Sequence, residues 1–187
     1  YGYLAALVQD NIVRLLAYSS IAQSGYFLLG IVAVGSSSLA LPSIIVFAAA
    51  YAAMNLGAFA VTAATGRHLH DFNGLGRVQP LTGIAMVVFL LSLVGIPPFA
   101  GFVGKFMLFA AAIDVLFTWL AVVAIANSVL SLAVYLRIVV PMYRPTETAI
   151  AAPGAWPGVV ALTAFAATLI IGLAAQFLLV GPMAGAP

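Results

Sequence analysis

A single lysine, Lys105, stands inside one of the most apolar stretches of the chain, residues 89–109. An ionisable side chain in such surroundings is costly, and it marks a functional site whose partner has to be found. The residues before it include a cluster of types that interrupt helices, namely Gly95, Pro97, Pro98, Gly101 and Gly104. Broken helices within a membrane are places where ions and protons tend to be handled. The pattern therefore predicts proton or ion chemistry at Lys105.

The composition identifies the surroundings of the whole chain. Of its 187 residues, 65% are hydrophobic and 5% are charged, and the mean hydropathy is +1.24. These values predict an integral membrane protein. Six basic and four acidic residues are too few to form a surface for nucleic acid, so no nucleic-acid role is expected. The chain has no cysteine, and His68 and His70 lack a complete ligand set, so no metal site is expected either.

Apolar runs long enough to cross a hydrocarbon core of about 30 Å predict the helices. They cover residues 14–34, 41–64, 81–115, 117–140 and 159–180, and short polar or Gly/Pro/Ser-rich connectors separate most of them. The third run is long enough to be either one interrupted span or two complete spans.

The arginines decide between these two arrangements. Arg14 begins the first span, Arg67 and Arg77 flank the end of the second, and Arg137 and Arg144 end the fourth. If the third run is one broken span, all five arginines fall on one face of the membrane, as the positive-inside tendency requires. We therefore predict an all-α polytopic membrane protein with five membrane-spanning helices, of which the third is discontinuous (residues 81–96 followed by 99–115).

In this arrangement Lys105 lies nine residues from Asp114, which marks the outer edge of the broken span. At 1.5 Å per residue the separation is about 13 Å, close to the middle of the hydrocarbon core. Desolvation there disfavours the ammonium form, so the side chain could act as a proton relay. The alternative is an anchoring lysine that reaches the interface. Pro97 and Pro98 lack N–H groups, so we expect free carbonyls near the end of the first half-helix.

Polar side chains on the first two spans are candidates for an aqueous path. Ser20 and Ser24 are spaced by four residues, and so are Tyr51 and Asn55, which puts each pair on one helix face. Such groups more often join helices by hydrogen bonds than conduct protons, and both roles stay open. The full set of candidates is Tyr18, Ser20, Gln23, Ser24, Tyr51 and Asn55.

Four ordered strings resemble a known family. They are residues 9–26 (QDNIVRLLAYSSIAQSGY), 51–59 (YAAMNLGAF), 71–77 (DFNGLGR) and 92–106 (SLVGIPPFAGFVGKF). These strings are similar to the antiporter-like membrane subunits of respiratory complex I, the NADH:quinone oxidoreductase. The last two resemble subunit N in particular, the relative of mitochondrial subunit 2. A further string at residues 126–137 extends the resemblance over essentially the whole chain.

The resemblance implies the second half of an antiporter-like fold. Residues 1–10 would end a preceding helix, residues 11–145 would form the second repeat with four spans, and residues 146–187 would form the last transmembrane helix and the C-terminus. The break at Pro97 and Pro98 would match the discontinuous helix of the family, and Lys105 would match its proton-relay lysine. The first repeat, with its own charged residues, is expected outside this sequence.

The same resemblance implies what other chains supply. Flavin, iron–sulfur clusters and quinone would belong to other subunits, since this chain has no cysteine and no dinucleotide-binding glycine fingerprint. The expected neighbours are subunit M on one side and subunit K with other small subunits on the other. The lipid bilayer would be a bacterial inner membrane, because the high alanine content suggests a GC-rich bacterial genome.

Three functions from different classes remain open at this point. The first is a proton-translocating membrane-arm subunit of complex I that has no catalysis of its own and uses Lys105 as a midplane relay. The second is a subunit of a multisubunit sodium/proton antiporter, which shares the broken helix and its lysine. The third is a structural scaffold without transport. The Asp-Phe-Asn-Gly-Leu and Ile-Pro-Pro strings favour the first function.

Overall fold

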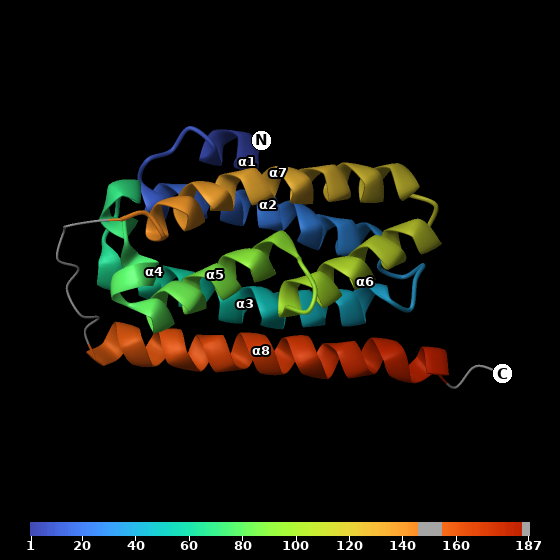
Figure 1. Cartoon of the computed structure of the whole chain (residues 1–187). Coiled ribbons are helices and arrows are strands. Elements are labelled where there is room, and N and C mark those ends of the chain that lie inside the picture. The colour runs from blue at the N-terminus through green and yellow to red at the C-terminus, as the bar shows by residue number, and fades with distance from the viewer. Residues whose placement is uncertain (146–154, 185–187) are drawn as a thin grey trace.

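The computed structural model describes residues 1–145 and 155–184, which fold into a bundle of helices that run alternately in opposite directions (Figure 1). No strand occurs among these residues, so the predicted all-α class is confirmed. Residues 146–154 and 185–187, which belong to the predicted last segment, lie outside the described residues.

The bundle contains helices of three lengths. Four long helices are apolar enough to cross a membrane. In the last of them, the candidate membrane span is Trp156–Ala174. Two helices of intermediate length follow one another in the middle of the chain, and three elements are short. In chain order they are α1 (Gly2–Ala6), α2 (Ile12–Val32), α3 (Ala40–Thr65), the 3-10 helix η1 (Leu69–Phe72), α4 (Leu75–Val78), α5 (Pro80–Val94), α6 (Ala100–Asp114), α7 (Thr118–Met142) and α8 (Ala155–Ala184).

Helices α5 and α6 form one broken span. At the start of α4, the short helix that precedes α5, the Gly74 N–H donates to the carbonyl of Pro141 near the end of α7, at 3.1 Å. At the far end of α6, the Ser37 hydroxyl donates to the carboxylate of Asp114 at 2.8 Å, which places Asp114 beside the end of α2. The two helices therefore cross the bundle together from one end to the other (Figure 1). The broken third span that the arginines predict is confirmed.

All five arginines gather at one end of this bundle, which we call the arginine end. Arg14 lies in the first turn of α2, and the Arg67 carbonyl, just after α3, accepts a hydrogen bond from the Ile12 N–H at 2.7 Å. The Arg77 Nε donates to the Tyr143 carbonyl at 2.7 Å, and Arg144 follows. These hydrogen bonds join the connections at this end into one unit.

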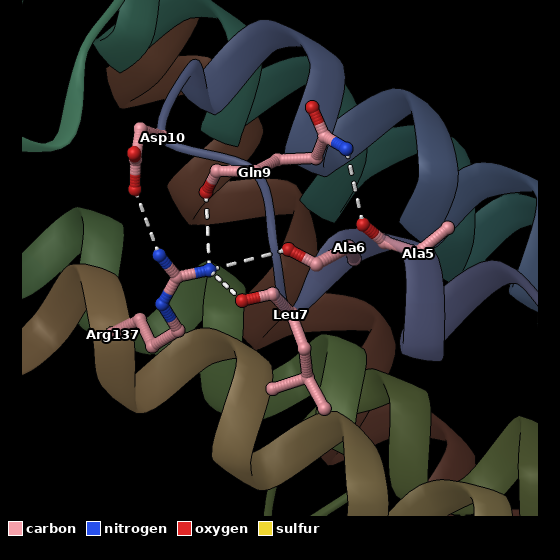
Figure 2. A network of polar contacts seen from close by, with 6 residues as sticks. All are labelled: Ala5, Ala6, Leu7, Gln9, Asp10 and Arg137. Atoms are coloured by element: carbon pink, nitrogen blue, oxygen red, sulfur yellow. Dashed lines mark hydrogen bonds and ion pairs between the residues drawn. The ribbon is translucent and has the colours of Figure 1, made fainter.

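Arg137 clamps the connection between α1 and α2 at the same end (Figure 2). Its Nη1 donates to the carbonyls of Ala6 at 3.4 Å and Gln9 at 3.1 Å, and also to that of Leu7. Its Nη2 pairs with the Asp10 carboxylate at 2.9 Å. Carbonyls at a helix C-terminus have no partner within the helix, and a basic side chain is a usual one. Arg137 therefore fixes α1 against α7.

The core of the bundle lies around α3, which packs on α2, α5, α6 and α8. Its buried centre includes Phe47, Met54 and Phe89. Large apolar side chains on α7 and α8 point away from this core, among them Val122, Val129 and Leu162, each more than half exposed. Such faces are typical of helices that meet lipid or other protein chains.

Candidate functional site

The site is built on the break between α5 and α6. Helix α5 ends at Val94 because Gly95 takes a left-handed conformation, with φ of 92°, which residues with a Cβ rarely adopt. Pro97 and Pro98 are joined by a cis peptide bond in the connection, and α6 begins at Ala100. The last carbonyls of α5 are thereby left without helical partners in the middle of the bundle.

Lys105, in the second turn of α6, fills this break. Its Nζ donates to the carbonyls of Leu93 at 2.7 Å and of Val94 at 3.0 Å. The side chain is only 2% exposed. The ring of Tyr26 lies under the ammonium group, with its centroid 4.2 Å from Nζ, in a cation–π arrangement. The free carbonyls of the broken helix are thus the partner that a charge at this depth needs.

The electrostatic balance of this site has no carboxylate in it. Among the described residues, no acidic side chain lies within ion-pair distance of Lys105, whereas Arg137 pairs with Asp10 and the His70 ring contacts Asp71. Within the part of the chain that the structure describes, the positive charge meets dipoles: two carbonyls, the negative C-terminal end of α5 and an aromatic face. A cation held in this way can lose its proton without leaving an anion behind.

Two glycines let α6 approach its neighbours closely. A Cβ on Gly101 would meet the carbonyl oxygen of Ser92 at 1.8 Å, and one on Gly104 would meet the Cα of Phe47 at 2.8 Å. The Gly101 N–H donates to the Ser92 hydroxyl at 3.1 Å, and that hydroxyl contacts the sulfur of Met54 at 3.2 Å. These contacts hold the start of α6 against the end of α5, which sets the reach of Lys105.

A buried polar chain leads from the break to α1 and α7. Gln23 Nε2 donates to the Leu93 carbonyl at 3.1 Å, and so shares this acceptor with Lys105. The same nitrogen donates to the Tyr3 hydroxyl at 3.0 Å. The Tyr3 hydroxyl lies 3.5 Å from that of Tyr135, which also bonds to Ser19. Each of these side chains is at most 2% exposed.

A second group of polar side chains surrounds the Tyr26 hydroxyl. The Tyr26 hydroxyl bonds to the Ser128 hydroxyl at 2.7 Å and accepts from the Asn127 amide at 3.3 Å, both on α7. Two cavities flank this group. One, of about 270 Å³, reaches Lys105 and Ser128, and the other, of about 330 Å³, is lined by Tyr26 and Asn127 among apolar side chains. The Lys105 site is therefore bordered by space on the α7 side.

The predicted path residues divide into two sets. Gln23 bonds to the same carbonyl as Lys105, whereas Tyr51 donates to Ser20 at 2.8 Å and Ser24 to the backbone of Ser20, apart from the lysine. The Tyr18 ring packs edge-on against Tyr1. The side chain of Asn55 forms no hydrogen bond within the described residues. Among these six candidates, only Gln23 shares a hydrogen-bonding partner with Lys105.

Sequence reasoning missed the tyrosines. Tyr3 and Tyr135 are 132 residues apart, and no local spacing pattern indicates that they meet. Tyr26 belongs to the string that the family resemblance covers, yet its position under Lys105 depends on how α2 crosses α6. Within the described residues, no three His, Cys, Asp or Glu side chains gather as a metal site would require.

The structure is a helical membrane bundle with a buried lysine in the break of a discontinuous span. Residues 1–131 match the family model described as "NADH:quinone oxidoreductase/Mrp antiporter, TM". The chain therefore belongs to this family, and its resemblance to the antiporter-like subunits is confirmed.

Individual relatives agree with this assignment. The chain is 42% identical to NADH-quinone oxidoreductase subunit N 1 of Streptomyces griseus, over 95% of this chain and 39% of the relative. A chain in the structure of respiratory complex I from Thermus thermophilus superposes with a TM-score of 0.81 at 35% identity, over 92% of this chain and 40% of the other. A chain of the Mrp complex from Dietzia superposes with a TM-score of 0.78 at 26% identity, over 95% and 42%. The sequence thus spans about two fifths of the length of its relatives.

Proposed function

We propose that this chain is the second half of subunit N of a bacterial NADH:quinone oxidoreductase and that Lys105 takes up and releases a proton as the complex turns over. One observation carries the proposal: Lys105 is buried in the break of a discontinuous helix and bonded to two freed carbonyls, with no carboxylate beside it among the described residues. The similarity to subunit N supplies the kind of complex.

The chemistry follows from this geometry. An ammonium group donates to both carbonyls and is favoured by the C-terminal dipole of α5. Without its extra proton, the neutral amine loses much of that attraction and can turn toward the neighbouring cavity, which also reaches Ser128. Water in that cavity could receive or return the proton, since the amine and the hydroxyl supply polar partners for it. A change in the surrounding field would then move a proton through Lys105.

In the proposed complex, other subunits supply the redox cofactors. Flavin, iron–sulfur clusters and quinone are proposed for other subunits, with subunit M on one side of this one and subunit K and other small subunits on the other. The arginine end is proposed to face the bacterial cytoplasm, because basic residues gather on the cytoplasmic side of inner-membrane proteins. The chain alone would carry no redox catalysis.

A second candidate is a subunit of a multisubunit sodium/proton antiporter, which the likeness to the Mrp complex favours. Such an assembly would have no redox partner. A scaffold without transport is the third candidate, and it gives Lys105 no role in proton movement.

Purification of the native assembly through a tag on the full-length subunit tests these candidates. The proposal predicts that flavin and NADH:quinone activity co-purify with it and that Lys105→Met lowers NADH-driven acidification of membrane vesicles while the assembly stays intact. Co-purification with cation antiporter subunits alone would establish the second candidate. Unchanged acidification by the Lys105→Met complex would exclude a role of Lys105 in proton movement and would favour the third candidate, a scaffold without transport.

A further inference from the structure

In the side-chain amide of Gln23, the nitrogen forms hydrogen bonds within the described residues and the oxygen does not. Its nitrogen donates to the Leu93 carbonyl and to the Tyr3 hydroxyl. Its oxygen, Oε1, is fully buried and has no hydrogen-bond partner among the described residues. Leaving a buried acceptor unpaired is unfavourable, because the oxygen has given up its hydrogen bonds to water. A donor that can reach this oxygen would therefore be bound there.

A titratable donor that shares a hydrogen-bonding partner with this amide is Lys105. The Leu93 carbonyl oxygen accepts from Lys105 Nζ at 2.7 Å and from Gln23 Nε2 at 3.1 Å, so the two nitrogens are less than about 6 Å apart. An ammonium group has three N–H donors. Two of them are used on Leu93 and Val94, which leaves one without a hydrogen-bonded acceptor in the described part of the chain.

We propose that Gln23 Oε1 is a second acceptor for the Lys105 ammonium, so that the lysine alternates between the Val94 carbonyl and Gln23. The inference rests on the proposed function, since it assigns a positioning residue to the same proton-exchanging lysine. At the second position the ammonium keeps the Leu93 carbonyl as a pivot and moves to the side of α2. The amide itself neither gains nor loses a proton.

The position of Lys105 beside Gln23 is next to the buried polar chain that leads to α1 and α7. Gln23 bonds to Tyr3, and Tyr3 lies against Tyr135 and the α1–α7 contact that Arg137 clamps. The first position lies next to the cavity that Val94, Lys105 and Ser128 help to line. Lys105 would thus have two states. In one it lies beside the cavity, and in the other it bonds to Gln23 and lies beside the polar chain.

Three variants of the full-length subunit in its native complex test the functional part. Gln23→Met keeps the size of the side chain and removes the acceptor, and Lys105→Met removes the donor. Thr62→Val is the matched control, because Thr62 is buried and hydrogen-bonded on α3 but contacts neither group. We expect Gln23→Met to lose most of the NADH-driven pumping that Lys105→Met loses, the double variant to lose no more, and Thr62→Val to pump like the native complex.

Isotope-edited infrared spectroscopy distinguishes a positioning role from a packing role. With glutamine labelled at its side-chain carbonyl, the band that Gln23→Met removes should shift to lower frequency during turnover, as a new hydrogen bond forms, and should not shift in Lys105→Met. The same shift in Lys105→Met would assign the donor to water and overturn the inference. Native pumping by Gln23→Met beside impaired Lys105→Met would overturn it while sparing the proposed function. Native pumping by Lys105→Met would overturn both.

Discussion

Two cations in this molecule are held by the carbonyls of helix ends, and they differ in what balances their charge. Arg137 binds three carbonyls at the end of α1 and is paired with Asp10 at the arginine end of the bundle. Lys105 binds two carbonyls at the end of α5 in the middle of the bundle, with no carboxylate beside it in the described residues. The first site holds a carboxylate that balances its cation, and in the second site the described residues supply dipoles.

The chemistry of the two side chains matches this difference. A guanidinium stays charged in proteins and presents a planar fork of donors, which suits a permanent clamp. An amine on a flexible stem can lose its proton when it is desolvated. Similar carbonyl ligands therefore hold a permanent clamp at one end of the bundle and, in our proposal, a proton-exchanging group at its centre.

Exchanging the type of basic side chain at the two sites should have the strongest effect on proton pumping. Lys105→Arg keeps a positive charge at the break but removes the ability to release a proton, so NADH-driven pumping of the assembled complex should fall nearly to the level of Lys105→Met. Arg137→Lys keeps one donor group at the clamp and should retain most pumping. Near-native pumping by a correctly assembled Lys105→Arg complex would remove the distinction between the two sites.

The geometry of the lysine site should be more sensitive than that of the clamp. Gly101→Ala places a methyl group where the Ser92 carbonyl oxygen lies only 1.8 Å away. The start of α6 must then move from the end of α5, at a cost of about 3 kcal/mol. The amount of assembled complex and its thermal midpoint should both fall. Unchanged values would show that the break tolerates a different spacing.

Loss of the clamp should affect stability before it affects proton movement. Arg137→Ala leaves three carbonyls and Asp10 without their donor, which should cost about 2 kcal/mol or more. The loosened contact between α1 and α7 should appear as faster hydrogen exchange in residues 2–10. Pumping per assembled complex should be retained better than in Lys105→Arg, and the reverse order would contradict the assignment of roles.

The smallest effect is expected from the acidic partner of the clamp. The Asp10 side chain is 83% exposed, so its pairing with Arg137 is screened by water and ions. Asp10→Asn should therefore lower stability by less than about 1 kcal/mol. The thermal midpoint of the variant at low and high salt measures this contribution. A loss as large as that of Arg137→Ala would show that the carboxylate, and not the carbonyls, holds the clamp.

The sequence was sufficient for the path of the chain across the bundle. The arginines selected one broken span, and the predicted halves at residues 81–96 and 99–115 compare with α5 at Pro80–Val94 and α6 at Ala100–Asp114. Charge placement and apolar length are properties of the chain in one dimension. They fix which residues share an end of the bundle, and they place Lys105 beside the break.

Contacts between helices were beyond the reach of the same reasoning. Four-residue spacing places Ser20 and Ser24 on one helix face, but the pattern does not say which neighbour that face meets. The structure turns Gln23 toward the break and turns Tyr18 and Ser24 elsewhere. Arg137 counted only as an interfacial charge in the sequence, because its carbonyl partners lie about 130 positions away. Such pairings depend on helix crossing and rotation, which packing decides.

Whether Lys105 carries a proton can be measured as the number of protons moved per electron pair, in membrane vesicles that contain the native or the Lys105→Met complex. We expect a lower ratio for Lys105→Met at matched rates of NADH oxidation, because one proton-exchanging group has been removed from the path. An equal ratio in both complexes would contradict the proposal that Lys105 carries a proton during turnover.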